Sequence, residues 1–85
     1  MIDYMKSEIL AYIQEEILDG ELAIDAGEDL LNSGFVDSMG FVRLVGFLEE
    51  QFGVEVPPED MTIEHFQSVN VMVAYLEAKL KAQSA

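Results

Sequence analysis

Residues 37–53 decide the fold, and they read DSMGFVRLVGFLEEQFG. Their apolar side chains recur at helical spacing, which predicts a helix over residues 38–51 with Asp37 as its N-cap and Gly53 at its C-terminal end. The residues expected to face inward are Phe41, Leu44, Val45, Leu48 and Phe52. Gly40 and Gly46 each cost this helix about 1 kcal/mol relative to alanine. We therefore expect a neighbouring helix or a partner protein to approach closely at both glycines.

A first helix is predicted over residues 3–18, with Asp3 as its N-cap and Asp19-Gly20 at its end. Its buried stripe is formed by Met5, Ile9, Ile13 and Ile17, joined by Ile2 and Leu10. Residues 21–36 show no sustained period but remain rich in apolar side chains. This segment is expected to be a long loop that is pinned to the core by Leu22, Ile24, Leu30, Leu31, Phe35 and Val36.

The segment after Gly53 predicts two further helices. Pro57-Pro58 breaks the chain, Thr62 can cap a short helical turn through Phe66, and Ser68 can start a last helix to about Lys81. The buried stripe of this last helix is formed by Met72, Tyr75, Leu76 and Leu80. The predicted fold is all-α: one domain over residues 1–85, a mostly antiparallel four-helix bundle with a long first loop and a short third helix.

Composition limits the classes of function. The chain has 17 acidic residues against 4 Lys and Arg, a net charge of −13, and 51% hydrophobic residues. Such a chain folds, repels nucleic acid and anionic lipid, and attracts basic protein surfaces, unless the charge serves solubility alone. The single histidine and the absence of cysteine exclude disulfides and the usual zinc sites. There is neither a signal-peptide pattern nor the ~18 apolar residues of a membrane span, so a cytoplasmic protein without membrane insertion is expected.

Ser38 stands at the start of the predicted helix over residues 38–51, where amide N–H groups and the helix dipole favour a phosphate. A nucleophilic serine needs a base, and His65 is the sole histidine that could act as one. No G-x-S-x-G pattern surrounds Ser38, so His65 is read as a structural residue and no catalytic site is predicted. Neighbouring acidic pairs such as Glu49/Glu50 lack a calcium-loop pattern, so they are read as solvated faces and no metal site is predicted. The sequence therefore favours Ser38 as an attachment point.

Met39 and Val42 flank Ser38 but lie off the predicted buried stripe. Exposed apolar residues beside an attachment point indicate a docking surface, and an extension of the core would explain them as well.

Residues 29–39, DLLNSGFVDSM, resemble the loop and attachment site of the acyl and peptidyl carrier proteins. The similarity continues through Leu44, through residues 48–57, LEEQFGVEVP, through Glu59-Asp60, and into the segment from Phe66 to Ser68-Val69. It covers most of the chain from Asp29 onward. The D-S-M triplet alone is a weak signal. The resemblance becomes specific because residues 29–36 before the triplet and residues 48–57 after it also match the family, at matching spacing.

The resemblance implies that Ser38 accepts 4'-phosphopantetheine from coenzyme A through a phosphopantetheinyl transferase, and that the thiol of the arm carries an acyl or aminoacyl group as a thioester. It assigns Asp37 to the encounter with the transferase, where it helps to hold the metal ion. It also assigns partner recognition to the helix over residues 38–51. The partner-binding residues we expect there are Met39, Val42, Arg43 and Glu49.

Three residues depart from the fatty-acid-synthesis pattern, which has leucine, an acid and glutamate where this chain has Met39, Gly40 and Arg43. The D-S-M-G sequence is more similar to stand-alone carriers such as the D-alanyl carrier protein, which an adenylating ligase loads. We therefore expect a monomeric, non-enzymatic carrier of a specialised pathway, with such a ligase and a downstream transferase or synthase as partners. The alternatives are a fatty-acid or polyketide carrier and an unmodified acidic adaptor.

Overall fold

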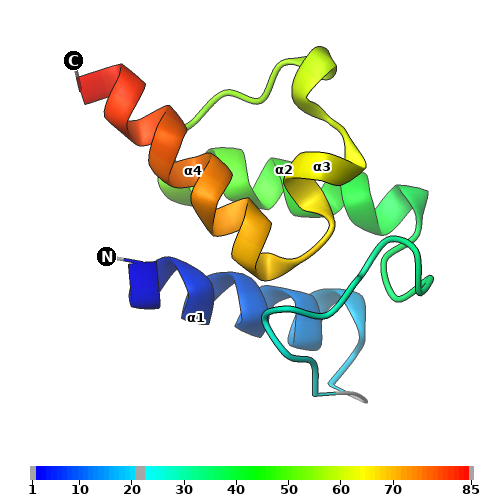
Figure 1. Cartoon of the computed structure of the whole chain (residues 1–85). Helices are drawn as coiled ribbons and strands as arrows, with labels where there is room; N and C mark the ends of the chain where they lie inside the picture. Colours follow the sequence, from blue (N-terminus) through cyan, green and yellow to red (C-terminus); the bar gives the residue numbers. More distant parts are fainter. Residues whose placement is uncertain (1, 21–22, 85) are drawn as a thin grey trace.

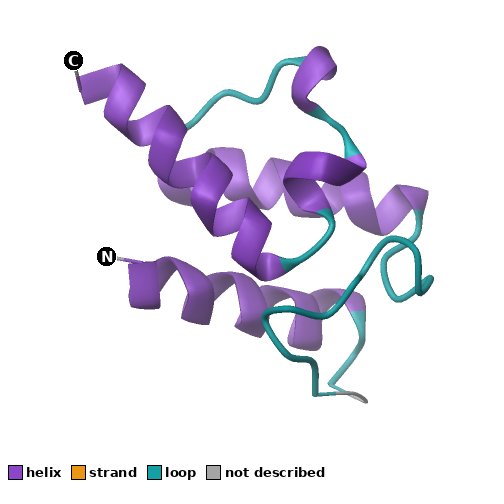
Figure 2. Cartoon of the chain, in the orientation of Figure 1, coloured by secondary structure: helices purple, strands orange, loops and turns teal. Residues whose placement is uncertain are grey.

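The computed structural model describes residues 2–20 and 23–84, and within them it contains helices and loops but no strand (Figure 2). The four α-helices are α1 (Ile2–Tyr12), α2 (Ser38–Phe52), α3 (Ile63–Phe66) and α4 (Val69–Ser84). A π-helical turn, η1 (Ile13–Ile17), extends α1, and a 3-10 turn, η2 (Pro58–Asp60), precedes α3. The predicted all-α fold with a long first loop and a short third helix is confirmed. None of the helices described is long and apolar enough to cross a membrane.

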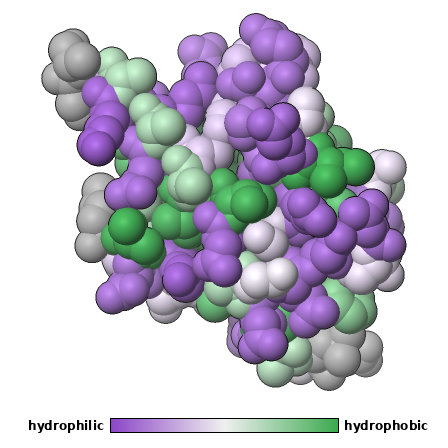
Figure 3. Space-filling model, in the orientation of Figure 1, coloured by the Kyte–Doolittle hydropathy of each residue, from purple (hydrophilic) through white to green (hydrophobic). Residues whose placement is uncertain are grey.

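The helices pack around one core. Figure 1 shows α1 and α2 running in opposite directions, with α4 crossing them at an angle and the short α3 against α2. The fully buried side chains are Met5, Ile9, Ile13, Leu30, Leu44, Leu48, Phe66, Val69, Met72 and Leu76. They come from all four α-helices, the π turn and the loop. Figure 3 shows hydrophilic side chains over much of the viewed face, with smaller apolar areas between them.

The first helix differs from its prediction at both ends. Asp3 is not the N-cap, because α1 already includes Ile2, and Ile2 is exposed rather than on the buried stripe. At the other end the helix widens into the π turn, where the Leu18 amide donates to the Ile13 carbonyl at 2.9 Å. Asp19 and Gly20 end it as predicted, since both have positive φ, 55° and 74°. The apolar period of the sequence does not distinguish a π turn from an α turn.

The loop after η1 is fixed to the core, as predicted. Ile24, Leu30 and Val36 are buried, and Leu31 and Phe35 pack against the core; Leu22 lies outside the described residues. Backbone bonds hold the loop to the start of α4: the Leu30 amide donates to the Gln67 carbonyl at 2.8 Å, and the Asn70 amide donates to the Ala26 carbonyl at 2.9 Å. These contacts position the segment that leads into Ser38.

The predicted starts of α3 and α4 are close to the observed ones. Thr62 takes the N-cap position of α3, but its side chain makes no capping bond; its backbone carbonyl accepts from the amides of His65 and Phe66, both at 3.2 Å. The first turn of this four-residue helix is therefore held by backbone bonds, without a capping bond to the Thr62 hydroxyl. Ser68 is buried, and its Oγ accepts from the Val71 amide at 3.4 Å, in keeping with its predicted place before α4.

Candidate functional site

Ser38 is the first residue of α2, and its side chain is exposed. Asp37 precedes it as the N-cap: its Oδ1 accepts from the Gly40 amide at 2.8 Å, and its carbonyl accepts from the Phe41 amide at 2.8 Å. The predicted cap is therefore confirmed. The serine hydroxyl stands at the positive end of a 15-residue helix, where a negatively charged group is stabilised.

The loop that leads to Ser38 is held by Asp29. The Asp29 carboxylate accepts from the backbone amide of Asn32 at 2.9 Å, from Asn32 Nδ2 at 2.8 Å, and from Gln67 Nε2 at 2.9 Å. Hydrogen bonds from Asn32, then from Gln67, lower the pKa of Asp29 below its ordinary value of 3.8. The carboxylate thus links the loop to the residue that joins α3 and α4.

An open surface groove of about 430 Å³ runs beside Ser38. It lies between the loop, the start of α2 and the start of α3, and its lining residues are Leu31, Gly34, Val36, Asp37, Ser38, Phe41, Met61, Thr62 and Ile63. Met61 and Ile63 are also exposed apolar residues. Sequence reasoning missed both as parts of this site; the available signal was two apolar side chains flanking Thr62 at the start of a short helix.

These residues fit the attachment of a flexible phosphate-bearing arm. The exposed hydroxyl of Ser38 can form an ester, the start of α2 suits the charge of the phosphate, and the groove offers both apolar and polar surface to the rest of an arm. No group of three or more metal-ligating side chains exists among the described residues.

Met39 and Val42 are exposed, with 76% and 67% of their surface accessible. They do not extend the core, and the docking surface stays a prediction. Both lie on α2 within one turn of Ser38. Met61 and Ile63, which line the groove beside Ser38, are likewise exposed apolar side chains.

Arg43 is exposed, but it is linked to the end of the first helix because its Nη2 donates to the Glu16 carbonyl at 3.0 Å.

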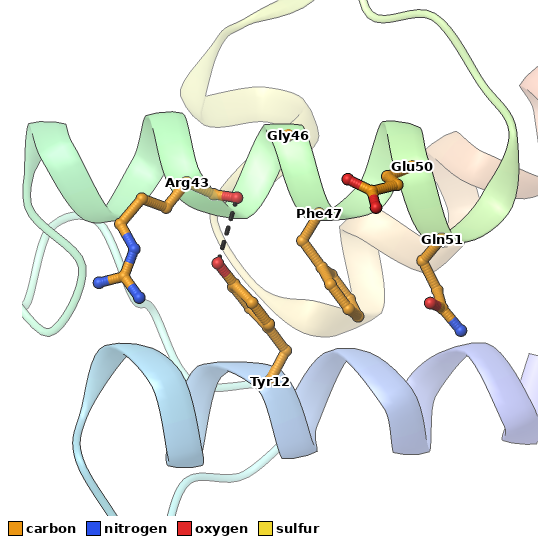
Figure 4. Close-up of a pocket in the computed structure, with 6 residues that line it drawn as sticks. All are labelled: Tyr12, Arg43, Gly46, Phe47, Glu50 and Gln51. Carbon is orange, nitrogen blue, oxygen red and sulfur yellow. Dashed lines mark hydrogen bonds between the residues drawn. The ribbon is translucent and has the colours of Figure 1, made fainter.

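A surface hollow of about 380 Å³ lies on this side of α2 (Figure 4). In it the Tyr12 hydroxyl donates to the Arg43 carbonyl at 3.3 Å. The rings of Tyr12 and Phe47 stack in the same hollow, with centroids 4.1 Å apart. Gly46 also lines it, and no atom lies within 4 Å of where a Cβ would stand. Among the described residues, therefore, no neighbouring helix approaches Gly46 closely, and approach by a partner protein stays a prediction.

Glu49, the fourth expected partner residue, is half-buried, and its Oε2 accepts from the Val56 amide at 2.9 Å. This bond holds the segment after Gly53 against α2. The structure therefore places Met39 and Val42 around Ser38, while Arg43 and Glu49 also make contacts within the fold.

His65 makes no hydrogen bond with Ser38 in the part of the chain that the structure describes. Its ring packs instead against Tyr75, with centroids 4.7 Å apart. The Tyr75 hydroxyl donates to Asp60 Oδ2 at 2.7 Å, and burial, followed by this bond, raises the pKa of Tyr75 above its ordinary value of 10. His65 thus belongs to a cluster that joins α3, α4 and η2.

Comparisons with known proteins agree with this site. A family described as phosphopantetheine attachment site matches residues 7–76. The chain is 28% identical over 78 residues to a D-alanyl carrier protein of Abiotrophia defectiva, covering 92% of this chain and 99% of the relative. It is 34% identical over 70 residues to the D-alanyl carrier protein of Streptococcus suis, covering 82% and 87%. It is 36% identical over 69 residues to the acyl carrier protein of Clostridium acetobutylicum, covering 75% and 87%.

A solved structure described as "Crystal structure of FAD-dependent dehydrogenase" contains a chain similar to this one, with a TM-score of 0.74 and 29% identity over 80% of this chain and 97% of that chain. The family match covers most of the chain, and the relatives are matched along most of their own length. The chain therefore belongs to the phosphopantetheine attachment site family and is a carrier protein whose cofactor is covalently attached 4'-phosphopantetheine.

Proposed function

We propose that Ser38 carries the 4'-phosphopantetheine and that this single-domain protein is a stand-alone aminoacyl carrier of a specialised pathway. The observation that carries the proposal is the position of Ser38: exposed, first in α2, capped by Asp37 and beside an open groove. When bound, the cofactor supplies a thiol, which this cysteine-free chain lacks, for holding cargo as a thioester.

The residues of the chain have distinct parts in this function. Asp37 fixes the start of α2 through its bond to the Gly40 amide and presents its carboxylate next to Ser38, where the transferase and its metal ion meet the carrier. Met39 and Val42 give the partner an apolar contact, and the acidic surface draws basic partners. Ser38 serves as the attachment point, where the transferase activates its hydroxyl, and not as the nucleophile of a catalytic site within this chain, since His65 packs on Tyr75. Because the reaction uses coenzyme A, and loading by an adenylating ligase uses ATP, we place the protein in the cytoplasm.

The attachment is tested by incubating the apo protein with coenzyme A, magnesium and a broad-specificity phosphopantetheinyl transferase. Intact mass spectrometry should show the addition of one phosphopantetheine to the native chain and none to Ser38→Ala. Ser33→Ala is the matched control, because Ser33 is an exposed serine of the loop that leads into Ser38 and its removal should leave the addition unchanged. Equal addition to the Ser38→Ala variant would refute Ser38 as the site.

The cargo class is inferred from Met39 and Gly40 in the D-S-M-G segment, from Arg43 in the next turn of α2, and from the two D-alanyl carrier relatives. Holo protein should be charged by a D-alanine-adenylating ligase with ATP, and it should be a poorer substrate for an acyl-carrier synthetase that loads fatty acids. The acyl carrier relative at 36% identity favours a fatty-acid or polyketide carrier as the second candidate. Preferential loading with a fatty acid would select that candidate.

The similar solved chain belongs to a structure of an FAD-dependent dehydrogenase, which suggests an enzyme of that kind as a downstream partner. Oxidation of the cargo on the loaded carrier, measured as the simultaneous reduction of the flavin in such an enzyme, would identify that partner.

A further inference from the structure

Gly40 and Gly46 lie in the same helix but in opposite surroundings. Gly40 is buried, and a Cβ built there would stand 3.3 Å from Asp37 Oδ1, 3.4 Å from Ile17 Cγ2 and 3.4 Å from Val36 Cγ1. Gly46 is exposed, and a Cβ there would meet nothing within 4 Å. Of these two glycines, therefore, only Gly40 has packing among the described residues that offsets the destabilisation a glycine imposes on a helix.

One of the two apolar neighbours of Gly40, both 3.4 Å from where its Cβ would stand, comes from the π turn. Ile17 is the last residue of η1, and a π turn changes the direction of the side chains after it relative to a continued α-helix. The same turn is tied to α2 by the bond from Arg43 Nη2 to the Glu16 carbonyl, at 3.0 Å. The end of the first helix is thus held directly over the first turn of α2.

Gly40 also takes part in the cap. Its amide is the donor to Asp37 Oδ1, and that same oxygen is the atom nearest to the missing Cβ. A side chain at position 40 would therefore be in tight contact with the cap oxygen, Ile17 and Val36, and the cap oxygen would have to shift by a few tenths of an ångström. Because Asp37 directly precedes Ser38 in the chain, a shift of the cap changes the orientation of the serine hydroxyl.

We propose that Gly40 is a positioning residue for Ser38: its missing side chain lets Ile17 and Val36 close over the start of α2, and this packing holds the Asp37 cap and the orientation of the serine. The inference rests on the proposed attachment at Ser38. It assigns to the D-S-M-G segment a function in presenting the hydroxyl to the transferase, separate from contact with the partner.

The test compares Gly40→Ala with Gly46→Ala in the apo protein. Both variants add the same methyl group to the same helix, so they differ in the surroundings of the methyl. The steady-state kinetics of phosphopantetheine transfer are measured by mass spectrometry at a temperature well below both melting temperatures. Hydrogen exchange of the amide at position 40 and the melting temperature are measured without the transferase.

For Gly46→Ala we expect a higher melting temperature and unchanged transfer kinetics. For Gly40→Ala we expect a kcat lower by about tenfold, since a misplacement of about 1 Å can cost about 100-fold. Its KM should change less, because Met39 and Val42 keep their exposed surface. The amide at position 40 should exchange faster as the cap loosens.

A rescue variant separates positioning from general stability. Gly40→Ala combined with Ile17→Ala removes one of the three atoms that the new methyl meets and leaves Asp37 Oδ1 and Val36 Cγ1 in place, so it should recover part of the protection of the amide and part of kcat relative to Gly40→Ala, with Ile17→Ala alone as the control. If Gly40→Ala alone does not fold, the double variant is compared with Asp37→Ala, which removes the acceptor of the cap. The inference then requires that the double variant folds and transfers phosphopantetheine faster than Asp37→Ala. Native kinetics in Gly40→Ala, an equal loss in Gly46→Ala, or no rescue would overturn the inference while Ser38 remained the attachment point. Failure of the native chain to be modified at Ser38 would instead overturn the proposed function.

Discussion

The two ends of α2 are held in different ways. At the serine end, the contacts come from elsewhere in the chain: Ile17 and Val36 lie within 3.4 Å of where a Gly40 Cβ would be, and the loop is bonded to Gln67. At the other end a local stop at Gly53 is joined by contacts from the two outer helices: Gln83 Nε2 donates to the Gly53 carbonyl at 3.2 Å, and Gln51 Nε2 donates to the Tyr4 hydroxyl at 3.3 Å. The Gly53 amide donates to the Glu49 carbonyl at 3.0 Å, and Gly53 adopts the left-handed conformation, with φ 68°.

This difference shows where the carrier needs fixed geometry. A helix can be ended by one residue with positive φ, as Gly53 ends α2. The end that presents Ser38 is fixed by tertiary contacts from the first helix, the loop and the segment before α4. Changes at the Gly53 end should therefore alter stability alone, whereas changes at the serine end should alter stability and phosphopantetheine transfer together.

The largest change in stability is expected for Gly53→Ala. Alanine in the left-handed region costs roughly 1–2 kcal/mol, so the free energy of unfolding should fall by about that amount. Transfer to Ser38 should be unchanged, because the contacts at the serine end remain. Urea denaturation and the transfer assay measure the two quantities. Gly53→Asn is the matched control, since asparagine tolerates this conformation better; an equal loss in both variants would argue against backbone strain as the cause.

A smaller loss is expected for Asp37→Ala, which removes the acceptor of the Gly40 amide. Loss of an N-cap costs about 1 kcal/mol, and transfer to Ser38 should slow as well. Asp37→Asn keeps a capping oxygen but removes the charge, so it should retain most of the stability. Slow transfer in Asp37→Asn would then report the carboxylate itself, and native stability in Asp37→Ala would show that the cap does not hold this end.

The two caps of α2 were predictable from the sequence, and the packing around the serine end was not. Gly53 after an apolar period and Asp37 before Ser38 are signals that act within a few residues, and the structure confirms both. The opposite environments of Gly40 and Gly46 carry no local signal, because the two glycines differ only in what the rest of the fold brings to them.

The same reason explains the other corrections. The π turn at Ile13–Ile17 keeps the apolar spacing of an α-helix, so its bond from the Leu18 amide to the Ile13 carbonyl could not be read from periodicity. Met39 and Val42 lie off the predicted buried stripe, but the sequence left open whether they extend the core, and the structure shows them exposed. The contribution of Met61 and Ile63 to the groove depends on how the segment before α3 returns to α2, which is a tertiary feature.

Arg43→Gln tests the link between α2 and the end of the first helix. The guanidinium bonded to the Glu16 carbonyl adds positive charge at a helix C-terminus, so its loss should cost about 0.5 kcal/mol. Arg43→Lys keeps the charge and should lose less. Arg43→Glu should in addition slow loading by the cognate ligase and improve loading by fatty-acid enzymes, because it restores a uniformly acidic surface. Unchanged stability and loading in all three variants would make Arg43 a bystander.

The smallest effect is expected at Asp29, and its sign depends on pH. Hydrogen bonds from Asn32 and Gln67 lower the pKa of Asp29 in the folded state below the ordinary 3.8, so the native state binds this proton less readily than the unfolded state. The contribution of Asp29 to stability is therefore present above pH about 4 and is lost as pH falls through the folded pKa. Asp29→Asn should lower the melting temperature at pH 7, and its deficit relative to the native chain should shrink towards pH 3. Asp25→Asn is the matched control: Asp25 is an exposed acid of the same loop whose carboxylate makes no hydrogen bond in the described part of the chain, so this variant should melt near the native temperature at pH 7. A deficit in Asp29→Asn that stays constant from pH 7 to pH 3 would mean that the shape of the side chain, and not the ionised carboxylate, holds the loop in front of Ser38.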